Sequence, residues 1–175
     1  MGLFHRKVVR DAMLACLGAG FNNAVNELSA TYGVPPFQLD FGPESASVWI
    51  GRINPEEVEL SALMEFPGAT LYTEDVKDGA PRIIQGVRFS GGLVGCVDIF
   101  IRPREGRERF ECESMLDMAE DAVFSLFRAY QWPVNSAASV TYSRRATAQK
   151  SRLIELSDGY GQSVSIQAQF EVVIP

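Results

Sequence analysis

The feature that most constrains the fold is a strand followed by a helix between residues 92 and 130. Residues 92–102 are apolar at both alternating sets of positions, and this pattern predicts a strand buried on both faces inside a sheet. Pro103 removes a backbone donor and ends the strand. Beyond a charged loop, apolar residues spaced by three and four predict an amphipathic helix over residues 112–130. The pair therefore indicates a helix layer packed on a sheet.

The last part of the chain contains the clearest alternation of apolar and polar residues. Its apolar set consists of Val164, Ile166, Ala168, Phe170, Val172 and Ile174. This alternation predicts a strand whose apolar face packs against the helices. The tetrapeptide at 158–161 predicts a hairpin turn before it. The strand that leads into this turn falls either at residues 139–146 or at residues 151–157.

A second amphipathic helix is predicted near the start of the chain, over residues 6–32, where apolar residues again follow a helical spacing. Gly18 and Gly20 interrupt it and indicate either a kink or a close contact with another helix. Gly33, which two prolines follow closely, is predicted to end the helix.

The segments between these elements are less regular. Short strands are predicted at residues 37–41 and 48–50, a helix is predicted to begin at Asn54, and a further strand covers residues 69–76. The glycine pair at 91–92 has two interpretations, a hairpin turn or a bulge within one long strand.

The order of these segments predicts an α/β fold of the α+β type. We expect a mixed or antiparallel sheet with the two main helices packed on it. The 175 residues suit a single domain, 1–175, and the 46% of hydrophobic residues are enough for a full core. An irregular insertion is expected at about residues 42–67.

Charge and apolar patterning exclude some functions. The formal net charge of −6 argues against a protein that wraps nucleic acid, because phosphate contacts need a surplus of Lys and Arg. No apolar run approaches the roughly 20 residues that span a bilayer, so no membrane association is expected. Cys16, Cys96 and Cys112 form no CxxC pair and are expected to be buried thiols, with a disulfide between Cys96 and Cys112 as the alternative.

The sequence contains no arrangement of residues that supports a catalytic or metal-binding site. His5 is the single histidine and precedes the first helix, so a nucleophile–histidine site is not expected. An acidic cluster falls at the start and on the outer face of the second helix, where carboxylates favour the helix dipole and face solvent. Its members are Glu111, Glu113, Asp117, Glu120 and Asp121. We predict no catalytic residue, no metal site and no cofactor.

One arrangement leaves an enzymatic alternative open. Asp98 lies in the buried strand, and Glu105 follows in the next loop, as carboxylates do in metal-dependent nucleases that bind Mg²⁺. The lysine that such a site needs is absent, and Glu105 lies beyond Pro103. A metal-dependent nuclease-like enzyme therefore stays as the alternative function.

Basic residues in polar loops and near the last strands are the candidate partner-binding residues. They predict a subunit or partner interface by charge complementarity. The set consists of Arg104, Arg107, Arg109, Arg144, Arg145, Lys150 and Arg152.

The sequence of segments resembles one known family. A helix that opens with residues 8–12 is followed by the proline-containing segment 35–37, the central strand 97–101, the helix 114–129 and the closing strand 163–172. This order resembles the tail-terminator and tail-completion proteins of tailed bacteriophages. The likeness is one of pattern over most of the chain, and the segment at 42–67 looks longer than the minimal family pattern.

The resemblance implies a structural virion protein of the phage tail or neck, assembled in the host cytoplasm. It implies a ring of this chain, usually of six copies, that caps the tail tube and contacts the tail tube protein and neck or head–tail connector proteins. DNA would pass through the lumen without specific binding, which suits an acidic protein. No catalytic residue comes with the resemblance, so the protein is expected not to be an enzyme.

Overall fold

The structure is a computed structural model, and it describes residues 4–53, 64–76, 89–102, 109–151, 154–156 and 159–175. The described elements, in chain order, are α1 (Phe4–Tyr32), β1 (Val48–Ile50), β2 (Gly68–Asp75), β3 (Phe89–Ile101), α3 (Arg109–Ala129), β4 (Ser139–Lys150), β5 (Ile154–Leu156) and β6 (Gly159–Ile174). The predicted α+β architecture is confirmed.

The strands form one mixed sheet in the order β1-β2-β3-β6-β4. β1 runs parallel to β2, and every other neighbouring pair in this order is antiparallel. β5 pairs with the first residues of β6. β3 lies between β2 and β6, so the strand that the sequence predicted to be inside the sheet is central. Its pairing partner is the alternating strand at the end of the chain, as expected.

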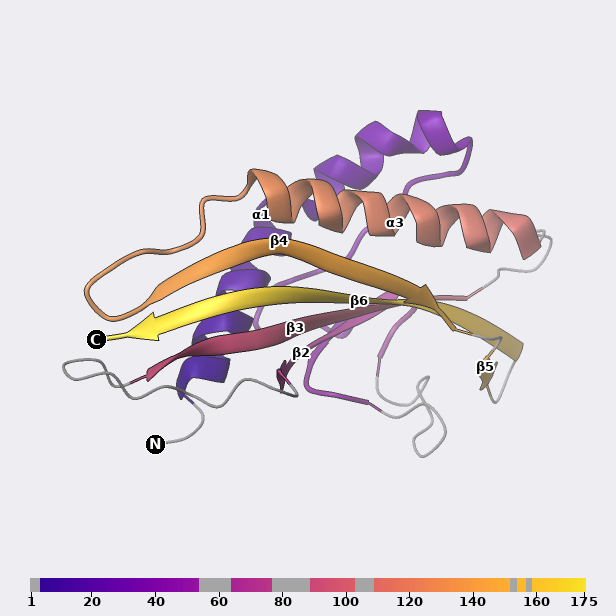
Figure 1. Cartoon of the computed structure of the whole chain (residues 1–175). Coiled ribbons are helices and arrows are strands. Elements are labelled where there is room, and N and C mark those ends of the chain that lie inside the picture. The colour runs from indigo at the N-terminus through magenta and orange to yellow at the C-terminus, as the bar shows by residue number, and fades with distance from the viewer. Residues whose placement is uncertain (1–3, 54–63, 77–88, 103–108, 152–153, 157–158) are drawn as a thin grey trace.

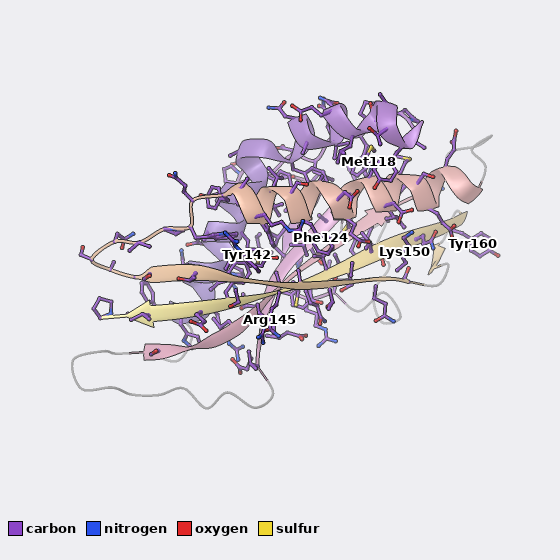
Figure 2. The ribbon with its side chains drawn as sticks, turned by 45° about the horizontal axis from the view of Figure 1, so that its top comes forward. Met118, Phe124, Tyr142, Arg145, Lys150 and Tyr160 are labelled. Atoms are coloured by element: carbon purple, nitrogen blue, oxygen red, sulfur yellow. The ribbon has the colours of Figure 1, made fainter. Side chains whose placement is uncertain are left out.

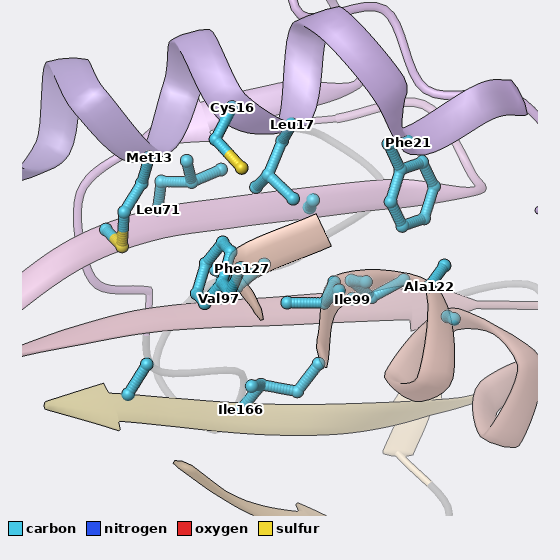
Figure 3. Packing of buried hydrophobic residues seen from close by; sticks show 14 of the residues in the cluster. Met13, Cys16, Leu17, Phe21, Leu71, Val97, Ile99, Ala122, Phe127 and Ile166 are labelled. Atoms are coloured by element: carbon cyan, nitrogen blue, oxygen red, sulfur yellow. The ribbon is translucent and has the colours of Figure 1, made fainter. Parts of the chain in front are cut away.

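Both helices pack on the same face of this sheet (Figure 1). Met13, Leu17 and Phe21 of α1 point toward Val97 and Ile99 of β3 (Figure 3). α3 adds a buried face to the same core, with these members: Cys112, Met115, Leu116, Met118, Ala119, Ala122, Val123 and Phe127. The stripes read from the sequence therefore face the sheet, because their burial removes the largest apolar area from water.

Two glycines in and after α1 have identifiable roles. A Cβ on Gly20 would lie 2.5 Å from Leu126 Cδ2 of α3, so this glycine allows the two helices to approach closely. This bears out the close-contact interpretation at Gly20. Gly33 has a φ of 65° and ends the helix in the left-handed conformation that glycine adopts without strain.

Several local predictions need correction. Residues 37–41 form no strand; Phe37 and Leu39 are buried beside α1, where the Asn22 amide bonds both backbone groups of Leu39 at 2.9 and 3.0 Å. The glycine pair at 91–92 is neither a hairpin turn nor a bulge, because β3 pairs with β6 in one unbroken register.

The chain before the last strand also differs from the prediction. It forms one long strand, β4, and one short strand, β5, so both alternative positions hold part of a strand. Gly159 to Gly161 belong to β6, and β5 pairs with them. Residues 159–161 of the predicted hairpin turn are therefore part of a strand, and Asp158 lies outside the described residues. In the predicted insertion, 42–53 contains β1. Most of the helix expected between Asn54 and Pro67 lies outside the described residues, and its expected last residues, 64–66, are not helical.

The three cysteines are buried thiols, as predicted, and the disulfide alternative is wrong. Burial raises the pKa of Cys16 and of Cys96 to about 12. No helix in the described part of the chain is long and apolar enough to cross a membrane.

Candidate subunit interface

Strand β4 forms one edge of the sheet, and β6 is its sheet partner among the described strands. Two backbone hydrogen bonds show which of its groups face outward. The Val140 N–H donates to the Pro133 carbonyl at 2.9 Å, away from β6, and the Ser151 N–H donates to the Ser163 carbonyl of β6 at 2.8 Å. Backbone groups alternate along a strand, so Ala146, Ala148 and Lys150 direct their N–H and C=O groups away from the sheet.

A bulge divides this edge. The register with β6 shifts between Tyr142 and Ala146, and Arg144 has a φ of 56°. A bulge twists an edge strand, and charged side chains on it oppose uncontrolled pairing with other strands. Arg144 and Arg145 are both exposed here, and Figure 2 shows Arg145 on the side of the sheet away from α3. The bulge thus presents two guanidinium groups to solvent.

Lys150 has a different role from these arginines. Its Nζ lies 2.5 Å from Asp117 Oδ1 of α3, with about a third of the lysine side chain exposed. Figure 2 shows Lys150 beneath the helix. A partly exposed ion pair of this kind contributes little stability, but it fixes the end of β4 to α3. Two residues of the acidic face that was predicted to be solvated therefore have partners. Asp117 pairs with Lys150, and Asp121 accepts a hydrogen bond from the Tyr32 hydroxyl.

The structure brings together two of the predicted interface residues, Arg144 and Arg145, at one bulge. Arg104, Arg107 and Arg152 lie outside the described residues. Arg109 is the first residue of α3, and the structure does not describe its side chain.

Asp98 lies in the middle of β3, on the face of the sheet that α1 and α3 do not cover, because its neighbours Val97 and Ile99 face the helix-side core. It is 9% exposed, and its Oδ2 accepts a hydrogen bond from Thr70 Oγ1 at 3.3 Å. The hydroxyls of Ser165 and Tyr72 also bond the carboxyl group, whereas Oδ1 has no partner among the described residues. Burial raises the pKa of Asp98, and these hydrogen bonds oppose the rise.

This environment does not suit the Mg²⁺ site of a nuclease. Hard divalent cations bind charged carboxylates with further oxygen ligands, whereas burial here favours the neutral acid. The neighbours that bond Asp98 are hydroxyls rather than carboxylates. Among the described residues, no group of three or more His, Cys, Asp or Glu side chains is arranged to hold a metal ion.

We expect the substitution Asp98→Asn to change how stability depends on pH. The raised pKa means that the folded chain binds this proton more tightly than the unfolded chain, so its contribution to stability is present at low pH and lost as pH rises from about 3.8 through the folded pKa. Asparagine stays neutral and removes this loss. Urea unfolding of both proteins at about pH 4 and about pH 7 measures the effect. The stability difference should shift toward the variant at the higher pH, and an equal difference at both pH values would contradict the assignment.

The other edge strand among the described strands, β1, was not among the predicted sites. β1 was predicted as a strand, but its position at the edge of the sheet was not predicted. Trp49 and Ile50 are 44% and 45% exposed there. Strand order depends on contacts between distant segments, and no local sequence signal indicates which strand is at an edge.

The chain matches no protein-family model, and comparison with curated proteins gives no match.

Proposed function

We propose that this protein is a structural subunit of a bacteriophage tail or neck. Copies of the chain form a ring that ends the tail tube and joins it to the head-proximal neck. The proposal has two supports. The first is the order of helices and strands, which resembles that of tail terminators. The second is the exposed basic bulge on β4, whose outer side pairs with no other strand that the structure describes.

The bulge at Arg144 and Arg145 is the observation that carries the proposal. A ring subunit needs a surface that binds its neighbour without producing open-ended aggregation. A strand edge that offers hydrogen-bonding groups beside fixed charges meets both needs, since the charges restrict pairing to a complementary partner. The ring would contact the tail tube protein and neck or connector proteins, within the virion. DNA would pass through its lumen.

Another head–tail connector or tail structural protein is a related candidate function, because such a protein would bind its neighbours through the same surface. The nuclease-like alternative was based on Asp98 and Glu105, and Glu105 lies outside the described residues. The burial and hydroxyl partners of Asp98 give that residue a structural explanation within the sheet. Metal-dependent cleavage of DNA that Asp98→Ala abolishes, in a variant that still folds, would revive that alternative.

Charge reversal at the bulge tests the structural proposal. The double variant Arg144→Glu/Arg145→Glu should abolish ring formation and leave the fold intact, because exposed charges contribute little to stability. Rings are counted by negative-stain electron microscopy and the mass by analytical ultracentrifugation. The control variant Lys7→Glu/Arg128→Glu changes the net charge by the same amount on the helices and should still form rings.

Two results would count against this function. One is a native protein that stays monomeric at high concentration, and the other is tight, salt-sensitive binding to duplex DNA, which a lumen surface should not give. If the Arg144/Arg145 variant forms rings as well as the native protein, the ring proposal stands and the bulge is not part of the interface between subunits.

A further inference from the structure

The sheet ends in two strands whose outer sides pair with no other strand of the described chain, β4 and β1. On β1, the Ser47 carbonyl accepts the Ala69 N–H at 2.7 Å and the Gly51 N–H donates to the Leu71 carbonyl at 2.9 Å, both toward β2. The alternation of a strand then places the backbone groups of Val48 and Ile50 on the outer side. The Val48 N–H already donates to Ser45 Oγ at 3.1 Å, so the Val48 carbonyl and both backbone groups of Ile50 remain for a further strand on this edge. On the β4 edge, the outward groups of Ala146, Ala148 and Lys150 are the corresponding donors and acceptors.

The charges at the β4 bulge and around β1 have opposite signs. β4 carries Arg144 and Arg145 at its bulge. Around β1 lie the exposed acids Asp40, Glu44 and Glu65. Two backbone hydrogen bonds fix the first and last of these beside the strand: the Asp40 N–H donates to Ser47 Oγ at 3.0 Å, and the Glu65 N–H to the Ala46 carbonyl at 2.9 Å.

Arg52, the one basic residue around β1 in the part of the chain that the structure describes, is already paired with Glu74 at 3.1 Å. The β1 edge therefore keeps an acidic excess. Two β4 edges would repel each other, whereas a β4 edge and a β1 edge attract.

The side chains at the edges also differ in size. Ile50 is 45% exposed and shares a face of the sheet with Val48, which packs against the main core on the helix side. Ala146 and Ala148 of β4 lie on that same helix side and are partly buried. A neighbouring β4 would bring these small side chains beside Ile50, so the isoleucine would lose its exposed apolar surface.

Strand directions fix how the edges meet. β1 runs with β2, and each later strand in the order reverses, so β4 points opposite to β1. An operation that carries one copy onto the next along the sheet therefore sets β4 antiparallel to β1 of the neighbour. The helices of both copies then stay on one side, which is the arrangement a closed ring with a continuous sheet wall requires.

We propose that copies of this chain join head to tail, with the outer edge of β4 in one copy pairing with β1 of the next. The inference rests on the proposed ring and names the surfaces that close it. The interface is heterologous, so each copy uses both edges and every edge in the ring is covered.

Cross-linking of the full chain tests this contact. The double variant Ile50→Cys/Ala148→Cys is treated with a short bismaleimide, and products are separated on a denaturing gel. The two positions lie at opposite edges of one copy, so a link between them joins neighbours. A ladder of covalent multimers that ends at the ring number is expected. Each single variant should stay monomeric on the gel, which also shows that the native thiols, all buried, do not react.

A matched control moves one cysteine away from the edge. In Ile50→Cys/Val173→Cys the second thiol lies on β6, between β3 and β4, at a residue that is 38% exposed. No ladder is expected from this variant. Analytical ultracentrifugation of every variant reports whether assemblies form.

The outcomes separate the two proposals. If assemblies form but the Ile50→Cys/Ala148→Cys variant gives no ladder, the β4–β1 contact is wrong and the ring proposal stands. Dimers from Ala148→Cys alone would replace it with a symmetric pairing of β4 with β4. A protein that stays monomeric would overturn the contact together with the ring.

Discussion

The substitution Phe170→Ala is expected to lower the free energy of unfolding by about 3–5 kcal/mol, as for a large-to-small change in a closed core. Phe170 is 1% exposed on the helix-facing side of β6. Its ring centroid lies 4.8 Å from that of Trp132, 5.6 Å from that of Tyr142 and 5.9 Å from that of Phe127. Removal of the ring leaves a cavity between α3, β4 and β6, because these aromatic neighbours hold each other in place and collapse only partly.

Chemical denaturation followed by tryptophan fluorescence measures this loss, since Trp132 contacts the substituted ring. Val173→Ala is the matched control on the same strand. Val173 is 38% exposed on the other face, so its truncation should cost a small fraction of the Phe170 value. A loss below about 1 kcal/mol for Phe170→Ala would mean that this face of β6 is not the core face.

A change in the opposite direction, Gly95→Ala, should cost about 1–3 kcal/mol by overpacking. Gly95 lies on β3 directly beneath α1, and a Cβ there would be 2.4 Å from Met13 Sδ and 2.7 Å from Phe170 Cε2. The phenyl ring is held by its aromatic neighbours, so the helix or the methionine must shift. This glycine is needed for close approach of α1 to the sheet rather than for a special backbone angle.

Two variants make this prediction specific. Gly92→Ala, on the same strand, places its Cβ 3.3 Å from Val76 Cγ2, a contact that a small side-chain movement relieves, so little change is expected. Combining Gly95→Ala with Met13→Ala should cost less than the sum of the single changes, because the second removes the atom that the first strikes. Additive costs would show that Gly95 and Met13 are not in contact.

The sequence predicted the elements that bury a one-sided stripe. The helices expected at residues 6–32 and 112–130 occur as Phe4–Tyr32 and Arg109–Ala129, and the alternation from Val164 to Ile174 lies in β6. These patterns are local and repeat over many residues, so a few exceptions do not hide them. Gly91 and Gly92 were misread because two glycines favour a turn locally, whereas pairing with β6 through this stretch keeps them extended.

The candidate interface was predicted only in part. Arg144 and Arg145 were in the predicted set because they are charged. Their meaning depends on β4 being an edge strand, and strand order follows from contacts between distant segments. The acids around β1 were missed for the same reason. Asp98 was chosen for its place in a buried strand, but its hydroxyl partners come from β2 and β6, which local spacing does not reveal.

The position of β6 between β3 and β4 has a consequence for synthesis in the cell. β3 and β4 lack their common neighbour until the ribosome has made β6, although both precede it in the chain. Until then the inner edge of β3 and the apolar side of α3 have no complete surface to pack on, so the growing chain exposes groups prone to aggregation. Folding therefore waits for the last strand, and we expect nascent chains that end before β6 to be recognised by chaperones and to remain sensitive to proteases.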